Sequence, residues 1–478
     1  MALADIAHIV VLMLENRSFD CMLGNLYPKS PDFDGLSGTE ANEDFNGTPV
    51  RVWNSGDTSK ASMSIPDPDP GELFTDINMQ LFGSSEIADP APPPTMSGFV
   101  KSYLSQTAKP AASYSANSVM HFFKPEQVPV ISTLARSFAV CDRWYASAPC
   151  QTWPNRFFVH TGTANGYENN APPHFPYEME TIFNRLEQAH LAWKVYFHDI
   201  AQSLTLSKLW PHAGHFRLYL EFQHDARLGN LPEYSFIEPR YFTDLTLAND
   251  QHPPHVVTLG EQLIADVYNC IRAGPGWTKT LLVITYDEHG GCYDHAAPPR
   301  AAPPSVTATT PFNFERYGVR VPAVIVSPYV PAGLKLRAAA GDVPFDHTSI
   351  IATLRRRFPL GGPLGNRDAV APDLAAALTL PGPNNSGPER IDALPYVPSP
   401  AEVATARTAP LNKHQRSLLQ LAAHLPATTA VGEFKPFIDS YLDHLRAGAA
   451  GTDVDAIHDV SSAVTLIKRR LGNLFRSI

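Results

Sequence analysis

The chain is poor in cysteine, with five among its 478 residues, and no two of them form a CxxC pair. This scarcity argues against a zinc ribbon or a disulfide scaffold, although it leaves room for one or two bridges. Long apolar segments are also missing, because no run reaches the ~18 residues that span a bilayer. The sequence therefore predicts neither a zinc-ribbon module nor a membrane-spanning helix.

Basic residues are in deficit as well. The chain has 37 Lys and Arg against 47 Asp and Glu, a formal net charge of −10, and no long basic run. Binding a polyanion needs clustered Lys and Arg that displace its counterions. Nucleic acid is therefore not expected as a partner.

The N-terminus lacks the features of a signal peptide. Residues Ile6–Leu14 are apolar enough to imitate its core, but no Lys or Arg precedes them and no small-residue cleavage site follows. We expect an unprocessed or already mature chain. The default location is then the cytoplasm, with secretion as the open alternative.

Proline, by contrast, is abundant, with 45 residues. Residues 40–118 are rich in Pro, Asp and Ser and show little periodicity, which is typical of a lid or a mobile segment. A second Pro-rich stretch covers about 385–410, and helices are expected after it at Asn412–Leu425, Gly432–Ala447 and Asp453–Ile478. The sequence predicts a catalytic domain over 1–385 with a long insertion, and a helical region over 386–478.

Four short apolar runs end abruptly in polar residues, namely Ile6–Leu14, Ala192–Phe197, Thr280–Tyr286 and Val319–Val326. Such runs are typical of strands that are buried on both faces. Between them, helices are expected at Pro129–Phe138, Glu180–His190, Leu259–Ala273 and Ser349–Arg357. The alternation predicts an α/β fold with a central, mostly parallel sheet flanked by helices, whose ligands bind beyond the carboxyl ends of the strands.

Two of these strand ends carry oxygen-rich pairs, Glu15-Asn16 and Asp287-Glu288. If both strands are central and parallel, three carboxylates converge at one edge, where only a cation would relieve their repulsion. An oxygen set favours Ca²⁺, Mg²⁺ or Mn²⁺ over zinc. The alternative is local, because Asn16 could cap a helix and Asp287 could open a turn.

Thr152 precedes Trp153-Pro154, and Pro154 suits the first turn of a helix that Gly162 or Gly166 would end. The free N–H groups of a helix N-terminus favour an anion, and a hydroxyl beside a metal can attack phosphorus. An ordinary capping Thr has the same pattern and, without other information, is the favoured interpretation.

Several histidines lie near predicted strand or loop ends, and protonated imidazoles could bind phosphoryl oxygens or protonate a leaving group. Among 18 histidines any single one can equally be structural, and Asp294-His295 could simply order a turn. His252 ranks first and His198 second among the candidates His198, His252, His255, His289 and His295.

Six segments resemble, in order, a phosphoesterase family that contains non-specific phospholipases C and a group of acid phosphatases. They are ENRSFD (Glu15–Asp20), TWPNR (Thr152–Arg156), DQHPPH with GEQL (Asp250–Leu263), DEHGGCYDHAAPP (Asp287–Pro299), GVRVPAVIVSP (Gly318–Pro328) and FDHTSI (Phe345–Ile350). The resemblance covers about residues 7–360 and implies a fold like that of alkaline phosphatases and sulfatases.

The resemblance also implies roles. One divalent metal ion would be held by Glu15, Asn16, Asp287 and Glu288. Thr152 would be the nucleophile that forms a phospho-enzyme intermediate, with His252 and His198 as its catalytic partners. Substrate or phosphate would contact Asn155, Arg156, His255 and His295.

The function expected from these roles is a phosphoesterase of phospholipase C type acting on phospholipids. One alternative is an acid phosphatase for soluble phosphomonoesters, and a remote one is a non-catalytic phosphate- or lipid-binding protein. The C-terminal stretch Leu466–Ile478 is apolar and basic, so membrane contact is expected to be peripheral at most. The chain shows neither the export signal nor the extra C-terminal β-rich domains of many secreted members, which weakens the inference of a lipid substrate.

Overall fold

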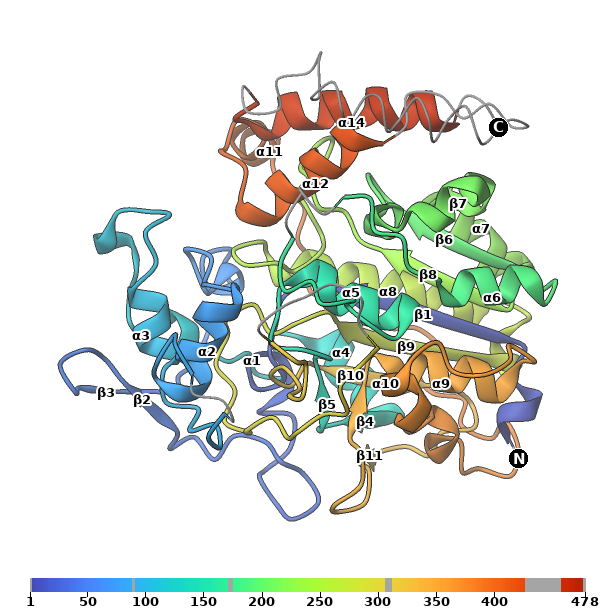
Figure 1. The fold of residues 1–478 in the computed structure, drawn as a ribbon, viewed down its shortest axis with the longest axis horizontal. Helices are drawn as coiled ribbons and strands as arrows, with labels where there is room; N and C mark the ends of the chain where they lie inside the picture. The colour runs from blue at the N-terminus through green and yellow to red at the C-terminus, as the bar shows by residue number, and fades with distance from the viewer. Residues whose placement is uncertain (1, 88–90, 171–174, 306–311, 426–456, 476–478) are drawn as a thin grey trace.

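The computed structural model describes residues 2–87, 91–170, 175–305, 312–425 and 457–475. At its centre is an eight-stranded sheet with the strand order β11-β4-β10-β9-β1-β8-β6-β7 (Figure 1). In that order the strands are Leu334–Leu336, Ala139–Cys141, Ala323–Val326, Thr280–Tyr286, His8–Leu14, Tyr234–Glu238, Trp193–Phe197 and Phe216–Leu218. The central strands β1, β8 and β9 are buried almost throughout, as expected for a sheet covered on both faces.

The strands of this sheet run in one direction except β10, which is antiparallel to both β4 and β9. The predicted α/β fold with a mostly parallel sheet is therefore confirmed. The exception to the common direction affects one of the four predicted strand ends. Because β10 is antiparallel to its neighbours, the residue after it, Ser327, lies at the opposite end of the strands from Glu15. This strand end therefore does not join the others.

Helices form at the four places predicted between the strands, as α4 (Pro129–Ser137), α6 (Ile182–Gln188), α8 (Val257–Ala273) and α9 (Thr348–Arg357). The helix predicted at Thr152 is α5 (Thr152–Thr161), which ends at Gly162, where a φ of 73° suits glycine. Contacts join α4 and α7 (Tyr219–Leu228) to α8, and α6 and α9 to α5. These two sets of helices cover the sheet.

Shorter elements complete the fold. Two-stranded pairings join β5 (Trp144–Tyr145) to β12 (Phe345–Asp346) and β2 (Ala41–Glu43) to β3 (Pro49–Arg51). Two further short helices are α1 (Phe19–Leu23) and α10 (Asn366–Val370). The 3-10 helices are η1 (Ala2–Asp5), η2 (Ser62–Ser64), η3 (Ala111–Ser113), η4 (Ser118–Met120), η6 (Gln202–Thr205), η7 (Ser207–His215), η8 (Trp277–Lys279) and η9 (Leu374–Ala377).

The long insertion at residues 40–118 is more ordered than its sequence suggests. It holds β2, β3, α2 (Phe74–Phe82) and α3 (Phe99–Leu104), and these pack around an apolar cluster that includes Ile77, Leu81 and Phe99. Its described residues are therefore a packed unit rather than a loose loop. The helices are too short to produce a visible hydrophobic period, which is why the sequence pattern missed them.

The C-terminal segment contributes α11 (Pro400–Arg407), α12 (Lys413–His424) and α14 (Val460–Phe475), which lie together at one end of the molecule (Figure 1). The helices predicted at 412–425 and 453–478 correspond to α12 and α14, and the one predicted at 432–447 lies outside the described residues. Leu418 and Ala422 of α12 join the main apolar core. The division into domains at residue 385 stays a prediction. Among the described helices, none is long and apolar enough to cross a bilayer.

Candidate active site

The pairing of β1 with β9 brings the two predicted polar pairs together. These strands are parallel, and Leu14 lies opposite Tyr286 in their register. The residues that follow, Glu15 and Asp287, therefore leave the sheet side by side. Asn16 has a φ of 54°, a left-handed conformation that asparagine tolerates, and its backbone N–H donates to Asp287 Oδ1 at 3.0 Å.

The strand-end cluster of Glu15, Asn16, Asp287 and Glu288 is fully buried. The Asn16 side-chain amide donates to Glu288 Oε1 at 2.7 Å and to Glu72 Oε1 at 2.7 Å. Burial raises the pKa of Glu288 well above its usual range, and the Glu72 and Asp287 carboxylates raise it further. So many acidic groups at one buried place call for a positive charge between them.

Arg156 supplies part of that charge. Its Nη2 contacts Glu15 Oε1 at 2.5 Å, and its Nε lies 3.9 Å from Asp287 Oδ2. Even so, burial raises the pKa of Glu15 well above its usual range; Arg156 opposes the shift and the Asp287 carboxylate adds to it. One guanidinium therefore does not neutralise the carboxylates of the strand-end cluster and Glu72.

A divalent cation would supply the positive charge that the strand-end cluster still lacks. Asp287 Oδ2 is buried and makes no hydrogen bond, which is rare for a carboxylate oxygen unless a ligand is missing. Thr152 Oγ1 lies 3.5 Å from both Glu15 Oε2 and Asn16 Oδ1. Oxygens that share one Ca²⁺, Mg²⁺ or Mn²⁺ ion lie about 3–3.7 Å apart. The donor set and this spacing both suit such an ion.

Thr152 does not cap its own helix. The N-cap of α5 is Gln151, and Thr152 is the first helical residue, with its hydroxyl directed at Glu15 and Asn16. The next backbone N–H, that of Trp153, donates to Asn170 Oδ1 at 2.8 Å, so this group is not free for an anion. The side chain of Thr152 therefore faces the strand-end cluster and does not cap α5.

Asn155 and Arg156, both predicted to contact phosphate, have different environments. The Asn155 amide is saturated by the backbone of the preceding loop, including the N–H and carbonyl of Ala148 and the carbonyl of Cys150. It fixes the loop that leads into Thr152. Arg156 keeps its Nε and Nη1 atoms buried without a hydrogen-bond partner. Of the two, Arg156 has a donor to offer to a phosphoryl oxygen.

His252 is fully buried beside acidic groups that come from the insertion. Its Nε2 lies 3.4 Å from Glu72 Oε1, and its Nδ1 lies 3.8 Å from Asp69 Oδ1. Burial disfavours the charged ring, but the carboxylates of Asp69, Glu72 and Asp250 outweigh it and raise the pKa of His252 to about 9. The ring is therefore protonated at neutral pH. Neither Asp69 nor Glu72 was predicted from the sequence.

Two further residues at the strand-end cluster were also not predicted. Gln202 Nε2 donates to Glu15 Oε1 at 2.7 Å, from a 3-10 turn whose N–H groups bind the Glu238 carboxylate. His414, from α12, lies 3.9 Å from Glu15 Oε2 and stacks on His252 with ring centroids 5.5 Å apart. Neither ring nitrogen of His414 has a hydrogen-bond partner. The C-terminal segment thus contributes to the site.

Comparison with known proteins shows the family of the chain. A model of the Phosphoesterase family matches residues 6–361. Non-specific phospholipase C1 of Arabidopsis thaliana is 37% identical over 437 residues, which are 87% of this chain and 79% of that protein. The chain belongs to the Phosphoesterase family. Phospholipase C A of Mycobacterium tuberculosis is 27% identical, over 80% of this chain and 79% of that protein.

Among solved structures, a protein in the alkaline phosphatase superfamily from Vibrio parahaemolyticus is 10% identical with a TM-score of 0.32, over 52% of this chain and 63% of that one. Phosphonate monoester hydrolase of Agrobacterium radiobacter is 9% identical with a TM-score of 0.35, over 78% and 77% of the two chains. The stretch that matches the Phosphoesterase family contains Thr152, the strand-end cluster and His252, whereas His414 lies beyond it.

Three further predicted histidines make most of their contacts away from Thr152, although His289 also touches the strand-end cluster, with its Nδ1 3.2 Å from Glu288 Oε2. His198 stacks on Tyr219 with centroids 4.2 Å apart, and its Nδ1 contacts the Glu238 carbonyl. His255, three residues after His252, pairs through its Nδ1 with Asp250 Oδ1 at 2.6 Å. His289 Nε2 contacts Gln80 Oε1 at 2.7 Å. Among the described residues none of these three rings contacts Thr152, so the predicted roles of His198 and His255 in this Phosphoesterase-family chain stay predictions.

His295 belongs to a separate ion-pair cluster. Its Nδ1 contacts Asp20 Oδ2 at 2.6 Å and its Nε2 contacts Asp34 Oδ1 at 3.1 Å, with Arg320 and Lys29 beside them. Burial opposes the charge, but hydrogen bonds to the two carboxylates raise the pKa of His295 to about 9. The ring orders the segment after Asp294 instead of reaching the site, as the local interpretation of the sequence allowed.

This environment predicts a pH-dependent contribution of His295 to stability. Because its folded pKa is raised above the ordinary 6.5, the contribution is complete below about pH 6.5 and is lost as the pH rises through about 9. In urea unfolding near pH 6, we expect His295→Gln to lower the free energy of unfolding by about 1–3 kcal/mol, and the difference from wild type to shrink near pH 10. His224→Gln, an exposed control, should change little. A difference that stays constant with pH would contradict the assignment.

Proposed function

We propose that this chain is a metal-dependent phosphoesterase of phospholipase C type that uses Thr152 as its nucleophile. The observation that carries the proposal is the convergence of Thr152 with the strand-end cluster, where its hydroxyl lies 3.5 Å from Glu15 Oε2 and Asn16 Oδ1. Membership of the Phosphoesterase family supports hydrolysis of phosphate esters. The Thr nucleophile and the metal are inferences from the geometry and from the resemblance of the motifs.

The cation would be held by Glu15, Asn16, Asp287 and Glu288, with Thr152 beside it. When bound, it lowers the pKa of the hydroxyl and offsets negative charge on the phosphoryl group. Ca²⁺, Mg²⁺ and Mn²⁺ suit this all-oxygen set better than zinc. Gln202 and Arg156 hold the Glu15 carboxylate by hydrogen bonds, so its position is set before a ligand arrives.

In the first chemical step, the Thr152 hydroxyl gives its proton to the adjacent Glu15 carboxylate, whose Oε2 lies 3.5 Å away, and Oγ1 forms a bond to phosphorus as the ester bond to the leaving oxygen breaks. The leaving alcohol takes a proton, for which the buried, protonated His252 is the best-placed donor near the cluster. The unpaired Nη1 of Arg156 is available to a phosphoryl oxygen. Water then attacks the phosphorus of the phospho-threonine, which restores the hydroxyl and releases the phosphorylated head group.

The substrate would approach through a cavity of about 540 Å³. Its wall includes Asp69, His255 and Lys413, each of which neighbours or contacts a residue of the site. Apolar side chains such as Leu247 and Val256 also line it. A cavity of this size that combines charged and apolar walls suits a lipid head group with part of its apolar body. The relatives named as phospholipases C agree with that choice.

A comparison of substrates tests the proposal. With a divalent ion present, we expect the rate on a phosphatidylcholine dispersion and on p-nitrophenyl phosphorylcholine to exceed that on p-nitrophenyl phosphate, by at least about tenfold in kcat/KM, because a lipid head group fills the cavity and a bare phosphate does not. Head-group release and p-nitrophenol absorbance measure the rates. A preference for p-nitrophenyl phosphate would favour the acid phosphatase alternative, and binding without turnover of any ester would favour a non-catalytic protein.

A further inference from the structure

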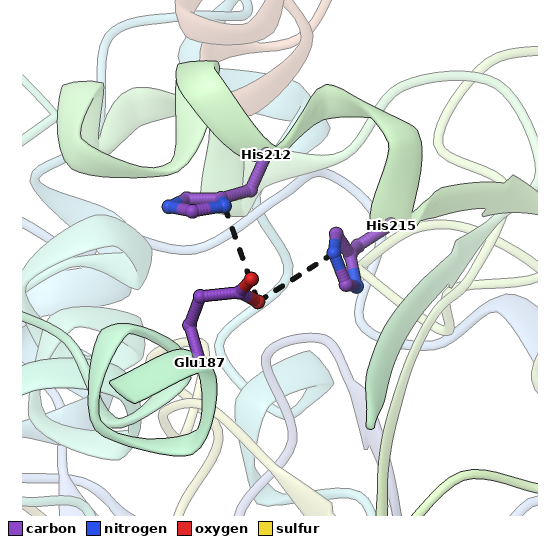
Figure 2. Close-up of side chains that lie close together, drawn as sticks. All are labelled: Glu187, His212 and His215. Atoms are coloured by element: carbon purple, nitrogen blue, oxygen red, sulfur yellow. Dashed lines mark ion pairs between the residues drawn. The ribbon is translucent and has the colours of Figure 1, made fainter. Parts of the chain in front are cut away.

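A second cluster of metal-binding side chains lies away from the active site, at the β7 edge of the sheet. Glu187, in the last turn of α6, faces two histidines of η7, as Figure 2 shows. Its Oε2 atom lies 3.6 Å from His215 Nε2 and 4.0 Å from His212 Nδ1. None of the three is among the residues assigned to phosphoester chemistry above.

The surroundings of the cluster fix the direction of its donor atoms. His215 Nδ1 lies 2.8 Å from the backbone carbonyl of Trp193, to which it must donate, so the Nε2 atom that faces Glu187 carries the free lone pair. The His215 ring also stacks on Trp193, with centroids 4.2 Å apart. Trp193 Nε1 in turn donates to Glu187 Oε2 at 3.1 Å. Hydrogen bonds to neighbouring groups thus orient both the imidazole and the carboxylate, as is typical of metal ligands.

His212 completes the cluster from a kink in η7, where its backbone leaves the helical conformation after Pro211. Its ring presents Nδ1 to Glu187 (Figure 2). At 4.0 Å, His212 Nδ1 is too far from Glu187 Oε2 for a direct hydrogen bond, and a cation between them would join the two side chains.

We propose that Glu187, His212 and His215 form a second metal site that takes a transition-metal ion of the Zn²⁺ class. Two imidazole nitrogens and one carboxylate oxygen suit zinc, copper or nickel, and not the Ca²⁺ or Mg²⁺ expected at the oxygen-rich active site. Ligands of a tetrahedral zinc ion lie about 3.3 Å apart. A closure of about 0.3–0.7 Å between these partly exposed side chains brings the two spacings from Glu187, 3.6 and 4.0 Å, to that value.

The ion would have three protein ligands and one position open to water, since the side chains are 26%, 34% and 42% exposed for His212, His215 and Glu187. Its effect would be to tie α6 to η7. These two elements contact each other, and η7 also contacts β6 and β7 at the edge of the sheet. We therefore expect the ion to stabilise this edge and to leave phosphoester hydrolysis unchanged.

Metal titration tests the site. The metal-free full-length chain is titrated with Zn²⁺, and with Co²⁺ as a spectroscopic probe, in the presence of saturating Ca²⁺. We expect one equivalent of Zn²⁺ per chain, visible ligand-field absorption of bound Co²⁺, and a raised thermal midpoint. His212→Ala and Glu187→Gln should each weaken this binding by at least about tenfold and remove the thermal shift, with hydrolysis of a chromogenic phosphodiester unchanged.

The matched control is His224→Ala, which removes an exposed histidine of the neighbouring α7 and should leave Zn²⁺ binding intact. Glu187→Gln is chosen because the amide oxygen can still accept from Trp193, so the fold is preserved. The proposal is overturned if Zn²⁺ does not bind under these conditions, or if both variants bind it as the wild type does. Loss of Zn²⁺ through Asp287→Asn instead would also overturn it, because the ion would then be at the active site.

Discussion

Replacing Thr152 with alanine should lower kcat for phosphoester hydrolysis by at least about 10³-fold, because it removes the oxygen that attacks phosphorus. The hydroxyl is buried at the first residue of α5 and lies 3.5 Å from Glu15 Oε2 and Asn16 Oδ1. The alanine side chain leaves no hydroxyl to activate and adds no clash. The rate on a chromogenic phosphodiester at saturating divalent ion measures the effect.

Two variants separate a nucleophile from a merely structural residue. Thr152→Ser keeps the hydroxyl and should retain a substantial rate. Thr161→Ala removes a second buried threonine hydroxyl at the far end of the same helix, where it bonds to backbone carbonyls, and should leave kcat within about threefold of wild type. Acid quenching during turnover should trap the substrate's phosphoryl group, with its remaining ester, on the wild-type chain but not on Thr152→Ala. Near-normal turnover by Thr152→Ala would remove Thr152 from the mechanism.

Much of the sheet could be predicted because its strands are buried on both faces and their sequences are continuous apolar runs. This holds for β1, β6 and β9. It failed for β8 (Tyr234–Glu238), which is equally buried but alternates polar and apolar residues and ends in a glutamate. The direction of β10 could not be predicted, since a run of apolar residues does not indicate which way a strand runs. Strand direction depends on the connections, which are tertiary information.

The residues of the candidate site also divide into those that the sequence could predict and those that it could not. Glu15, Asn16, Asp287 and Glu288 could be predicted because each follows a strand, and the β1–β9 register then determines that they meet. The local sequence could place Thr152 at the start of a helix, but only the resemblance of the motifs singled it out as the candidate nucleophile.

Glu72, Gln202 and His414 had no such local signal. Glu72 lies in a Pro- and Asp-rich insertion, and His414 lies after a linker-like stretch. Their segments pack against the strand ends only in the folded chain. No periodicity or spacing in the sequence marks these three residues.

Asp287→Asn should reduce both metal content and activity, and it tests the strand-end cluster independently of Thr152. Asp287 Oδ1 accepts the backbone N–H groups of Asn16 and Glu288, which an asparagine Oδ1 can also do, so the loop should keep its shape. The buried Oδ2 atom, which has no hydrogen-bond partner, becomes an amide that repels a cation. Elemental analysis should show the loss of the bound divalent ion, and kcat/KM should fall by about 10²-fold or more.

Glu261→Gln is the matched control, because it also replaces a buried carboxylate by its amide. Burial raises the pKa of Glu261 to about 8, so this group is already neutral at pH 7, and it accepts the N–H groups of Val130 and Ile131 as an amide oxygen would. Metal content and activity should be unchanged.

The sign of the stability change gives the sharper test of the strand-end cluster. Without metal, Asp287→Asn removes one of several mutually repelling buried charges, so the metal-free variant should be more stable than the metal-free wild type, by about 1 kcal/mol. With saturating metal the order should reverse, because only the wild type gains binding energy. Urea unfolding with and without a chelator measures both differences. A variant that is less stable in both states, with its metal retained, would mean that Asp287 stabilises the fold and does not bind the ion.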